Sequence, residues 1–314
     1  MNTEIVPDSE HRGFVARLPQ GLRDLALLAR FDRPIGWWLL FWPCVFGVWL
    51  AGEGLQLALL GWLLLGSIAM RGAGCVYNDI VDADLDAKVA RTASRPVASG
   101  RVSKKLAWGW LVALSLVGLV VLLQLRWQAQ AVALASLALV AAYPFMKRIT
   151  WWPQAWLGMV FNWGLLVGWS ELRLDNLGAL AAVYAGAICW VIGYDTIYAL
   201  QDREDDALVG IRSSALAMGS KVTGGIAGFY AAAIGFWGLG VWLYRPDPLA
   251  LLALCRLRRI SSGRWQRLIR KTRIIRSPGS VRTAWPARSW LRPVLWSGTR
   301  DLVLRLRAVQ ISRT

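Results

Sequence analysis

The chain has 314 residues, of which 56% are hydrophobic and only 18% charged, with a mean hydropathy of +0.42. Soluble globular proteins carry about a quarter charged residues, so this composition excludes a disordered chain, a disulfide scaffold and most soluble enzymes. The net charge of +17 is concentrated in residues 255–314, which hold 16 of the 36 Lys and Arg residues but only one of the 19 acidic residues. The basic character therefore belongs to one segment and does not indicate a nucleic-acid-binding protein.

Charged residues divide the first 250 residues into seven long uncharged windows. A helix needs about 20 apolar residues to cross a bilayer, and only helices or closed barrels satisfy their backbone groups there. The windows lack the alternating pattern of barrel strands. We therefore predict an all-α, multi-pass transmembrane helical bundle with spans at 34–52, 54–70, 106–125, 127–146, 149–170, 176–194 and 222–244.

The first 33 residues are polar, contain five arginines and lack the apolar core of a signal peptide. Under the positive-inside rule, this N-terminal segment is expected in the cytoplasm. Alternation of the spans then places residues 77–105, 147–148 and 195–221 on the same side, and these loops are also rich in Lys and Arg. Charge bias and span order thus predict the same topology.

One of these loops begins with a cluster of acidic residues. Asn78, Asp82 and Asp86 are spaced four residues apart, which puts them on one face of a helix. Carboxylates this close repel one another unless a cation lies among them. A hard divalent ion with oxygen ligands removes that conflict, so these three residues are candidate metal ligands, with Asp79 a weaker one.

A second acidic cluster follows a later span on the same predicted side. It contains Asp195, Asp202 and Asp206, of which the last two are again four residues apart. Basic residues accompany both clusters. Carboxylates, Mg²⁺ and basic side chains together are how proteins hold a diphosphate. The candidate diphosphate-binding cations are Lys88, Arg91, Arg95, Lys147 and Arg148.

Two other interpretations of the acidic clusters stay open at this point. A single Asp-rich stretch is usually a solvated loop, although two matched clusters make that less apt. Acidic residues near a membrane also line ion or proton pathways in transporters. The positions of these acids at span ends, beside basic residues, favour anion binding over an ion pathway.

The two clusters resemble the signature motifs of the UbiA superfamily of intramembrane prenyltransferases. The first is similar to the family's NDxxDxxxD, with Asn78, Asp79, Asp82 and Asp86, and continues into a match to RTxxRPxxxG from Arg91 to Gly100. The second is similar to the family's DxxxD, with Asp202 and Asp206. The resemblance runs from about residue 25 to about residue 250, and it implies a fold of nine helices around a central cavity.

Further stretches are similar to the bacterial 4-hydroxybenzoate polyprenyltransferases within this superfamily. They are FDRPIGWWLLFWP (31–43), YPFMKRITWWPQAWLG (143–158) and DTIYALQDREDD (195–206), with Arg212 where that subfamily usually has Lys. The resemblance implies Mg²⁺-dependent transfer of a polyprenyl group from polyprenyl diphosphate to the 4-hydroxybenzoate ring, ortho to the hydroxyl, in ubiquinone biosynthesis. It also implies a bacterial inner membrane. Haem, a naphthoate or homogentisate as the acceptor, and an ion-coupled transporter, are the alternatives.

Roles follow from this resemblance and from charge. Asn78, Asp82, Asp86, Asp202 and Asp206 are expected to bind magnesium diphosphate. Arg33, Arg71 or Arg148 is expected to hold the benzoate carboxylate. Asp195 is expected to position the phenol or take its proton, and Asp82 and Asp202 to be essential for catalysis.

The chain after residue 250 departs from the family, which continues with two more helices. Arginine at the density found in 255–314 does not fit a membrane span. Plausible codons for 280–286, read in a shifted frame, permit a sequence close to the family's FRSNRxxG. We therefore interpret residues 34–250 as the membrane prenyltransferase domain and 255–314 as a frameshift product. The alternative is a genuine basic tail that binds anionic lipid headgroups.

Overall fold

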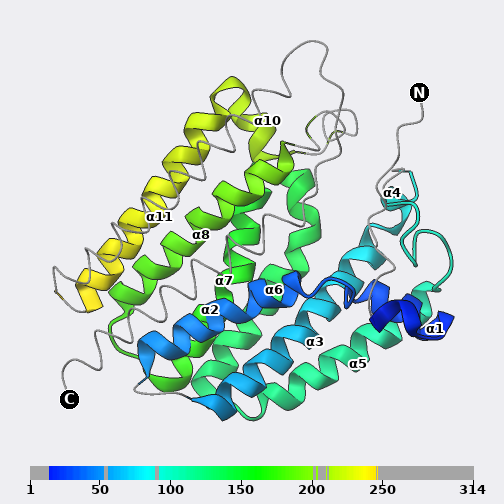
Figure 1. Ribbon diagram of the computed structural model, residues 1–314, viewed down its shortest axis with the longest axis horizontal. Helices are drawn as coiled ribbons and strands as arrows, with labels where there is room; N and C mark the ends of the chain where they lie inside the picture. The colour runs from blue at the N-terminus through cyan, green and yellow to red at the C-terminus, as the bar shows by residue number, and fades with distance from the viewer. Residues whose placement is uncertain are drawn as a thin grey trace. The chain divides into compact units, whose positions relative to one another are not determined.

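The computed structural model describes residues 14–52, 56–88, 92–200, 203, 210, 212–244 and 246. Within these residues every regular element is a helix (Figure 1). Seven helices are long, and each overlaps one predicted span: α2 (Ile35–Ala51), α3 (Leu57–Val81), α5 (Lys104–Leu122), α6 (Trp127–Ile149), α7 (Pro153–Leu172), α8 (Leu177–Ala199) and α11 (Val222–Tyr244). Helix α3 continues eleven residues beyond the predicted span 54–70 and so includes Asn78 and Asp79 of the first acidic motif. Asp202, Asp206 and Arg91 lie outside the described residues, as does the whole of 255–314.

Five helical segments are long and apolar enough to cross a membrane, beginning at Leu57, Lys104, Trp127, Leu177 and Ser214. Helix α2 is apolar but shorter, with 17 residues. The predicted α-helical membrane fold is therefore confirmed. Large apolar side chains on the outer faces of α5 and α6 are exposed, as expected where lipid rather than protein covers a helix.

Local sequence signals explain where several helices begin and end. Ser103 starts α5 because its hydroxyl accepts a hydrogen bond from the Leu106 amide, at 3.2 Å. Pro153 occupies the first turn of α7, where its missing N–H costs no helical hydrogen bond. Arg30, just after the short helix α1 (Gln20–Leu28), has a positive φ of 59° and turns the chain toward α2.

The long helices pack in the order α5, α3, α2, α7, α8 and α11, with α6 packed on the other side of α7. Figure 1 shows α8 and α11 side by side, and α3 beside α5. Tryptophan indoles join some of these helices. Trp156 and Trp163 of α7 donate hydrogen bonds of 2.8 Å to the backbone carbonyls of Leu139 and Val132 in α6.

Helices α2 and α7 approach each other closely, and this approach depends on glycine. Gly164 and Gly168 are spaced as in the GxxxG packing motif of membrane helices. A Cβ built on Gly168 would lie 2.5 Å from the Cys44 carbonyl oxygen and 2.9 Å from the Val48 amide nitrogen. Because both atoms belong to the backbone, they cannot move aside as the tip of a side chain can.

We expect Gly168→Ala to destabilise the fold by about 1–3 kcal/mol, as overpacking does elsewhere. The matched control is Gly109→Ala in α5, where a Cβ meets nothing within 4 Å. That change should stabilise the helix by about 0.4–1 kcal/mol, because alanine loses less backbone entropy on folding. Thermal unfolding of the detergent-solubilised protein measures both. Shifts of the same sign in the two variants would refute this account of the α2–α7 contact.

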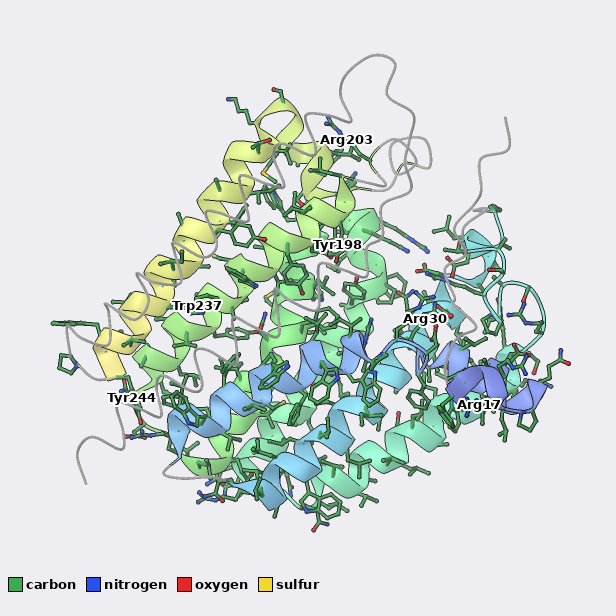
Figure 2. The ribbon with its side chains drawn as sticks, in the orientation of Figure 1. Arg17, Arg30, Tyr198, Arg203, Trp237 and Tyr244 are labelled. Atoms are coloured by element: carbon green, nitrogen blue, oxygen red, sulfur yellow. The ribbon has the colours of Figure 1, made fainter. Side chains whose placement is uncertain are left out.

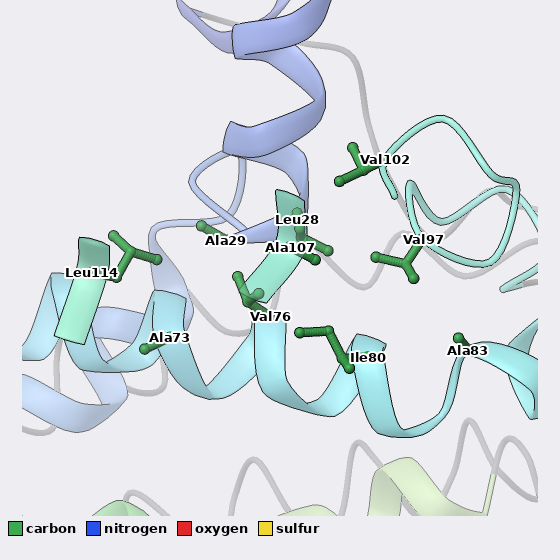
Figure 3. Close-up of a cluster of buried hydrophobic side chains, with 10 residues drawn as sticks. All are labelled: Leu28, Ala29, Ala73, Val76, Ile80, Ala83, Val97, Val102, Ala107 and Leu114. Carbon is green, nitrogen blue, oxygen red and sulfur yellow. The ribbon is translucent and has the colours of Figure 1, made fainter. Parts of the chain in front are cut away.

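The short helix α1 lies at the end of the bundle that carries the first acidic motif. Its last residues pack in a buried cluster with α3, α5 and the loop after α4 (Ala83–Asp86). Figure 3 shows Leu28 and Ala29 of this segment against Val76 of α3 and Ala107 of α5. The motif region is thereby fixed to the N-terminal segment as well as to the bundle.

The opposite end of the bundle has its own polar contacts. The Arg173 guanidinium donates to both oxygens of Asp175, at 2.6 and 2.7 Å, and lies against the rings of Trp169 and Tyr244. These hydrogen bonds hold the pKa of the Asp175 carboxyl below its usual range. They fasten the turn between α7 and α8 at this end.

Candidate active site

A cavity of about 1130 Å³ lies inside the bundle, lined mainly by α3, α5, α6 and α7. Its polar end contains six of the predicted site residues: Arg71, Asn78, Asp86, Lys88, Arg95 and Lys147. Most of the remaining wall is apolar. The cavity therefore combines charged groups at one end with a long hydrophobic interior.

The first acidic motif bends where a continuous helix was predicted. Helix α3 ends at Val81, and α4 begins at Ala83 after a bend at Asp82. The i to i+4 backbone hydrogen bonds nevertheless continue, from the Asp82 amide to the Asn78 carbonyl at 2.9 Å and from the Asp86 amide to the Asp82 carbonyl at 2.8 Å. The helical backbone pattern is therefore kept across the bend, and Asn78 and Asp86 line the main cavity, whereas Asp82 is not among its lining residues.

Asp82 is almost completely buried, with 1% of the residue exposed, and has two cationic partners. Its Oδ2 accepts a hydrogen bond of 2.7 Å from Lys147 Nζ, and its Oδ1 accepts one of 3.0 Å from an Arg148 Nη2. These partners come from the last turn of α6, 65 and 66 residues further along the chain. Packing of α3 and α6 thus joins a predicted metal ligand to two predicted diphosphate-binding cations.

Arg95 joins the other two carboxylates of the first motif. Its Nη1 donates to Asp86 Oδ2 at 2.8 Å and lies 3.4 Å from Asp79 Oδ1. Thr92 supports this loop by donating to the Asp86 carbonyl oxygen at 3.0 Å. Asp84, by contrast, is an exposed residue of the same stretch, with its side chain 92% exposed beside Lys104. The motif therefore contains three buried acids, Asp79, Asp82 and Asp86, and one exposed acid, Asp84.

A second, smaller pocket of about 250 Å³ lies beside the main cavity and is lined by four arginines: Arg30, Arg33, Arg71 and Arg95. Three of them, Arg30, Arg71 and Arg95, also line the main cavity. The Arg71 guanidinium lies 5.2 Å from the centre of the Phe161 ring. Its Nε is buried and has no hydrogen-bond partner among the described residues. This concentration of guanidinium groups is suited to a small anion.

Gly36 of α2 makes room for Arg71 in this pocket. A Cβ at residue 36 would lie 2.8 Å from Arg71 Nε. The absence of a side chain lets the guanidinium pass between α2 and α3 and reach the pocket.

Asp195 belongs to α8, and it is not part of the wall of either cavity. Tyr143 of α6 is a lining residue of the main cavity. Arg212, which stands where the similar subfamily usually has Lys, binds the C-terminal end of α6. Its Nη1 donates to the Ile149 carbonyl at 2.6 Å, and its guanidinium covers the Trp151 ring.

The sequence interpretation missed Arg30, which lies one residue before the stretch that carried the family resemblance. It was counted only among the positive charges of the N-terminal segment. Arg30 Nη2 binds Asp79 Oδ1 at 3.0 Å, and Figure 2 shows this arginine beside the C-terminal end of α3. No local signal in the sequence separates it from the other basic residues of that segment.

The donors of the first motif fit magnesium in their chemistry, because they are carboxylate and amide oxygens, the ligands that a hard cation prefers. Within the described part of the chain, no group of three or more His, Cys, Asp or Glu side chains forms a metal site by itself. A metal held here would therefore share its ligands between this motif and groups beyond it. Asp202 and Asp206, outside the described residues, are the predicted additional ligands.

Comparison with known proteins identifies the family. Residues 40–273 match the model of the UbiA prenyltransferase family. Among similar curated proteins is the mitochondrial 4-hydroxybenzoate polyprenyltransferase of Drosophila pseudoobscura pseudoobscura, 46% identical over 232 residues, which are 72% of this chain and 58% of that protein. The human protein of the same name is 42% identical over 224 residues, 69% of this chain and 60% of its own length. The chain thus spans less than two thirds of the curated relatives it matches.

Solved structures with the same fold include an apo UbiA homolog from Aeropyrum pernix K1. It is 27% identical, with a TM-score of 0.58, and the match covers 73% of this chain and 90% of that one. A UbiA homolog from Archaeoglobus fulgidus bound to GPP and Mg²⁺ has a TM-score of 0.58 at 17% identity, covering 84% of this chain and 91% of that one.

These comparisons correct one expectation. A bacterial inner membrane was expected, but this is contradicted by the curated relatives, which are mitochondrial proteins of eukaryotes. The family assignment made from the two acidic motifs is confirmed: the chain belongs to the UbiA prenyltransferase family.

Proposed function

We propose that this protein transfers a polyprenyl group from a polyprenyl diphosphate to the aromatic ring of 4-hydroxybenzoate, in a reaction that requires Mg²⁺. The observation that carries the proposal is the main cavity, whose polar end holds Asn78, Asp86, Arg95 and Lys147 while its interior is apolar. A donor with a charged head and a long hydrocarbon tail matches that division. The names of the curated relatives support 4-hydroxybenzoate as the acceptor.

In this proposal the polar end binds the diphosphate of the donor. Asn78, Asp82 and Asp86, with Asp202 and Asp206, would hold the magnesium ion, which neutralises diphosphate charge when bound. Lys88, Arg91, Arg95, Lys147 and Arg148 would bind the remaining oxygens. Stabilising charge on the leaving group in an apolar cavity is the largest contribution such a site makes to catalysis.

The reaction breaks the bond between C1 of the prenyl group and the diphosphate oxygen, and the bonding electrons leave with the diphosphate. The allylic cation is attacked by the ring carbon ortho to the hydroxyl, which forms a carbon–carbon bond. The ring then loses the proton from that carbon. Aromatic side chains such as Tyr143 and Phe161, which line the cavity, stabilise a cation through their faces, and the apolar walls exclude water that would trap it.

The arginine-lined pocket is the proposed site of the benzoate carboxylate, with Arg71 and Arg33 as its ligands. Its volume of about 250 Å³ suits a single small ring. Arg71 also lines the main cavity, so an acceptor held there would present its ring to the donor. Asp195 would position the phenol or take its proton through groups near Tyr143.

The donor's tail is proposed to leave the cavity between α5 and α6 into the lipid. On α3 the lining runs from Leu63 to Asp79, about 24 Å at 1.5 Å per residue. Leu119, Leu134 and Leu137 line the cavity although they are 45%, 52% and 45% exposed. A side chain that lines a cavity and is also half exposed marks an opening, so the wall between α5 and α6 is open to the side.

Filling this opening should discriminate between donors of different length. We expect Ser136→Trp, at a lining position of α6, to lower kcat/KM for a long polyprenyl diphosphate by about tenfold or more, because binding energy along the tail is lost. Geranyl diphosphate, whose tail ends inside the cavity, should react within about twofold of wild type. The control is Ala138→Trp on the exposed face of α6. Equal losses with both donors would refute this tail path.

The experiment that tests the proposed function compares acceptors. Membranes containing the protein receive a polyprenyl diphosphate and Mg²⁺ with 4-hydroxybenzoate, a naphthoate, homogentisate or haem in parallel, each with an EDTA control. We expect product from 4-hydroxybenzoate in the samples with Mg²⁺ and no product in the EDTA controls. Product with another acceptor alone would refute the choice of acceptor. Ion flux through liposomes without any prenyl substrate would favour a transporter.

We propose in addition that residues 255–314, which lie outside the described residues, are a frameshift product. The family match ends at residue 273, inside this segment, so it does not itself mark residue 255 as the boundary. The nucleotide sequence tests this proposal: a shifted frame that stops early or encodes no apolar span would refute it.

A further inference from the structure

Two arginines from distant parts of the chain meet on one buried carboxylate. Asp79 is 2% exposed, and its Oδ1 lies 3.0 Å from Arg30 Nη2 and 3.4 Å from Arg95 Nη1. The two guanidinium groups are themselves largely buried, with side chains 12% and 15% exposed. Two like charges so close repel unless a shared counter-charge holds them. Asp79 supplies that charge.

The N-terminal helix α1 delivers Arg30 to this position. Arg30 Nη1 donates to the Leu27 carbonyl at 3.0 Å, which secures the turn after α1. The helix itself is fastened by the Asp24–Arg101 ion pair, at 3.0 Å, and by a hydrogen bond of 3.1 Å from the Trp110 indole to the Leu25 carbonyl. The Arg30 guanidinium is thus held through both of its terminal nitrogens, by the Leu27 carbonyl and by Asp79.

Arg30 and Arg95 line both the main cavity and the smaller arginine-lined pocket. They therefore stand on the wall that the two cavities share. Asp79 itself lines the main cavity, but its Oδ1 is already used by the two guanidinium groups. Through these contacts Asp79 supports the two arginines.

We propose that Arg30 is a further anion-binding residue of the active site, and that Asp79 is the positioning residue that holds Arg30 and Arg95 between the donor and acceptor pockets. The ligand class is a phosphate or carboxylate anion. The proposal rests on the proposed function for its assignment of the two pockets. It adds the N-terminal segment, through α1, to the machinery that binds substrate.

The test uses the purified full chain and inorganic pyrophosphate with Mg²⁺ as the probe, measured by isothermal titration without turnover. We expect Arg30→Met and Asp79→Asn each to weaken pyrophosphate binding by about tenfold, in line with the loss of one charge-assisted contact. The double variant should bind about as weakly as either single variant, because both changes remove the same arrangement. Arg30→Lys, which keeps the charge, should restore part of the affinity.

Asp24→Asn is the matched control, because it breaks the other ion pair of α1 without touching either cavity. It should lower the melting temperature while pyrophosphate binding stays within about twofold of wild type. If Asp79→Asn and Arg30→Lys also lower only the melting temperature, the role is structural and the proposal is wrong. A wild-type protein that does not bind pyrophosphate would likewise overturn it.

The titration distinguishes a failure of this anion-site proposal from a failure of the proposed prenyl-transfer reaction. Arg30-dependent pyrophosphate binding by a protein that prenylates no acceptor would support the anion site and refute the reaction. Prenylation by a wild-type protein whose Arg30→Met and Arg30→Lys variants bind pyrophosphate normally would refute the anion site alone.

Discussion

Asp82→Asn is expected to reduce kcat/KM for prenyl transfer by about 10³-fold or more, while the protein still folds and inserts into membranes. Removing a group that stabilises leaving-group charge typically costs about 10²–10³-fold, and Asp82 also orders two cations. Its carboxylate accepts from both Lys147 and Arg148, at 2.7 and 3.0 Å. A neutral amide has one acceptor oxygen, so it loses the charge and one of these contacts together.

The cost to stability should be small by comparison. The Lys147 and Arg148 side chains are 28% and 48% exposed, so water screens the charges that Asp82 leaves behind. We expect a loss of about 1 kcal/mol in unfolding free energy. The amount of protein in the membrane fraction and its melting temperature measure this part of the prediction separately from activity.

Asp84→Asn is the matched control for Asp82→Asn. Asp84 lies two residues away in the same acidic stretch, but its side chain is 92% exposed and pairs with the exposed Lys104 at 3.3 Å. It should leave kcat/KM within about twofold of wild type. Full activity of Asp82→Asn, or an equal loss of kcat/KM in both variants, would show that Asp82 has no specific role in the active site.

Arg71→Met is expected to raise the KM for 4-hydroxybenzoate by about 10–100-fold, with little change in the KM for the donor. A hydrogen bond to a charged group contributes about 1.5–3 kcal/mol, and the buried Arg71 Nε has no partner among the described residues. Methionine fills similar space against Phe161 without a positive charge. Initial rates at varied concentrations of each substrate separate the two KM values.

An acceptor without a carboxylate sharpens this prediction. Wild-type protein should prefer 4-hydroxybenzoate to 4-hydroxybenzamide, and Arg71→Met should lose most of that preference. Arg173→Met is the control, since Arg173 also lies against aromatic rings, 5.5 Å from the centres of Trp169 and Tyr244, but at the other end of the bundle. If Arg71→Met raises the KM for both acceptors equally, Arg71 does not bind the carboxylate.

The helical membrane fold was predictable because span length and charge bias are properties of consecutive residues. The seven windows between charged residues overlap seven helices for this reason. The bend at Asp82 was not predictable, because the i to i+4 spacing of Asn78, Asp82 and Asp86 is the same in a straight helix. The close approach of α2 to α7 at Gly168 also depends on which helices become neighbours.

The acids of the site could be found from sequence, but their partners could not. Regular spacing marked Asp82 and Asp86, whereas the pairing of Asp82 with Lys147 and Arg148 joins residues 65 and 66 positions apart. Arg30 reaches Asp79 across 49 positions, and no spacing rule predicts such a contact. The curated relatives, not the motifs, corrected the predicted membrane.

The most direct test of the central claim is the product made by the purified protein from 4-hydroxybenzoate, a polyprenyl diphosphate and Mg²⁺. The assay is run on this chain and on a version with the alternative reading frame restored after residue 254. The account predicts a compound heavier than 4-hydroxybenzoate by one prenyl group less one hydrogen, joined by a carbon–carbon bond ortho to the hydroxyl and absent with EDTA. No such product from either version, with short or long donors, would contradict it.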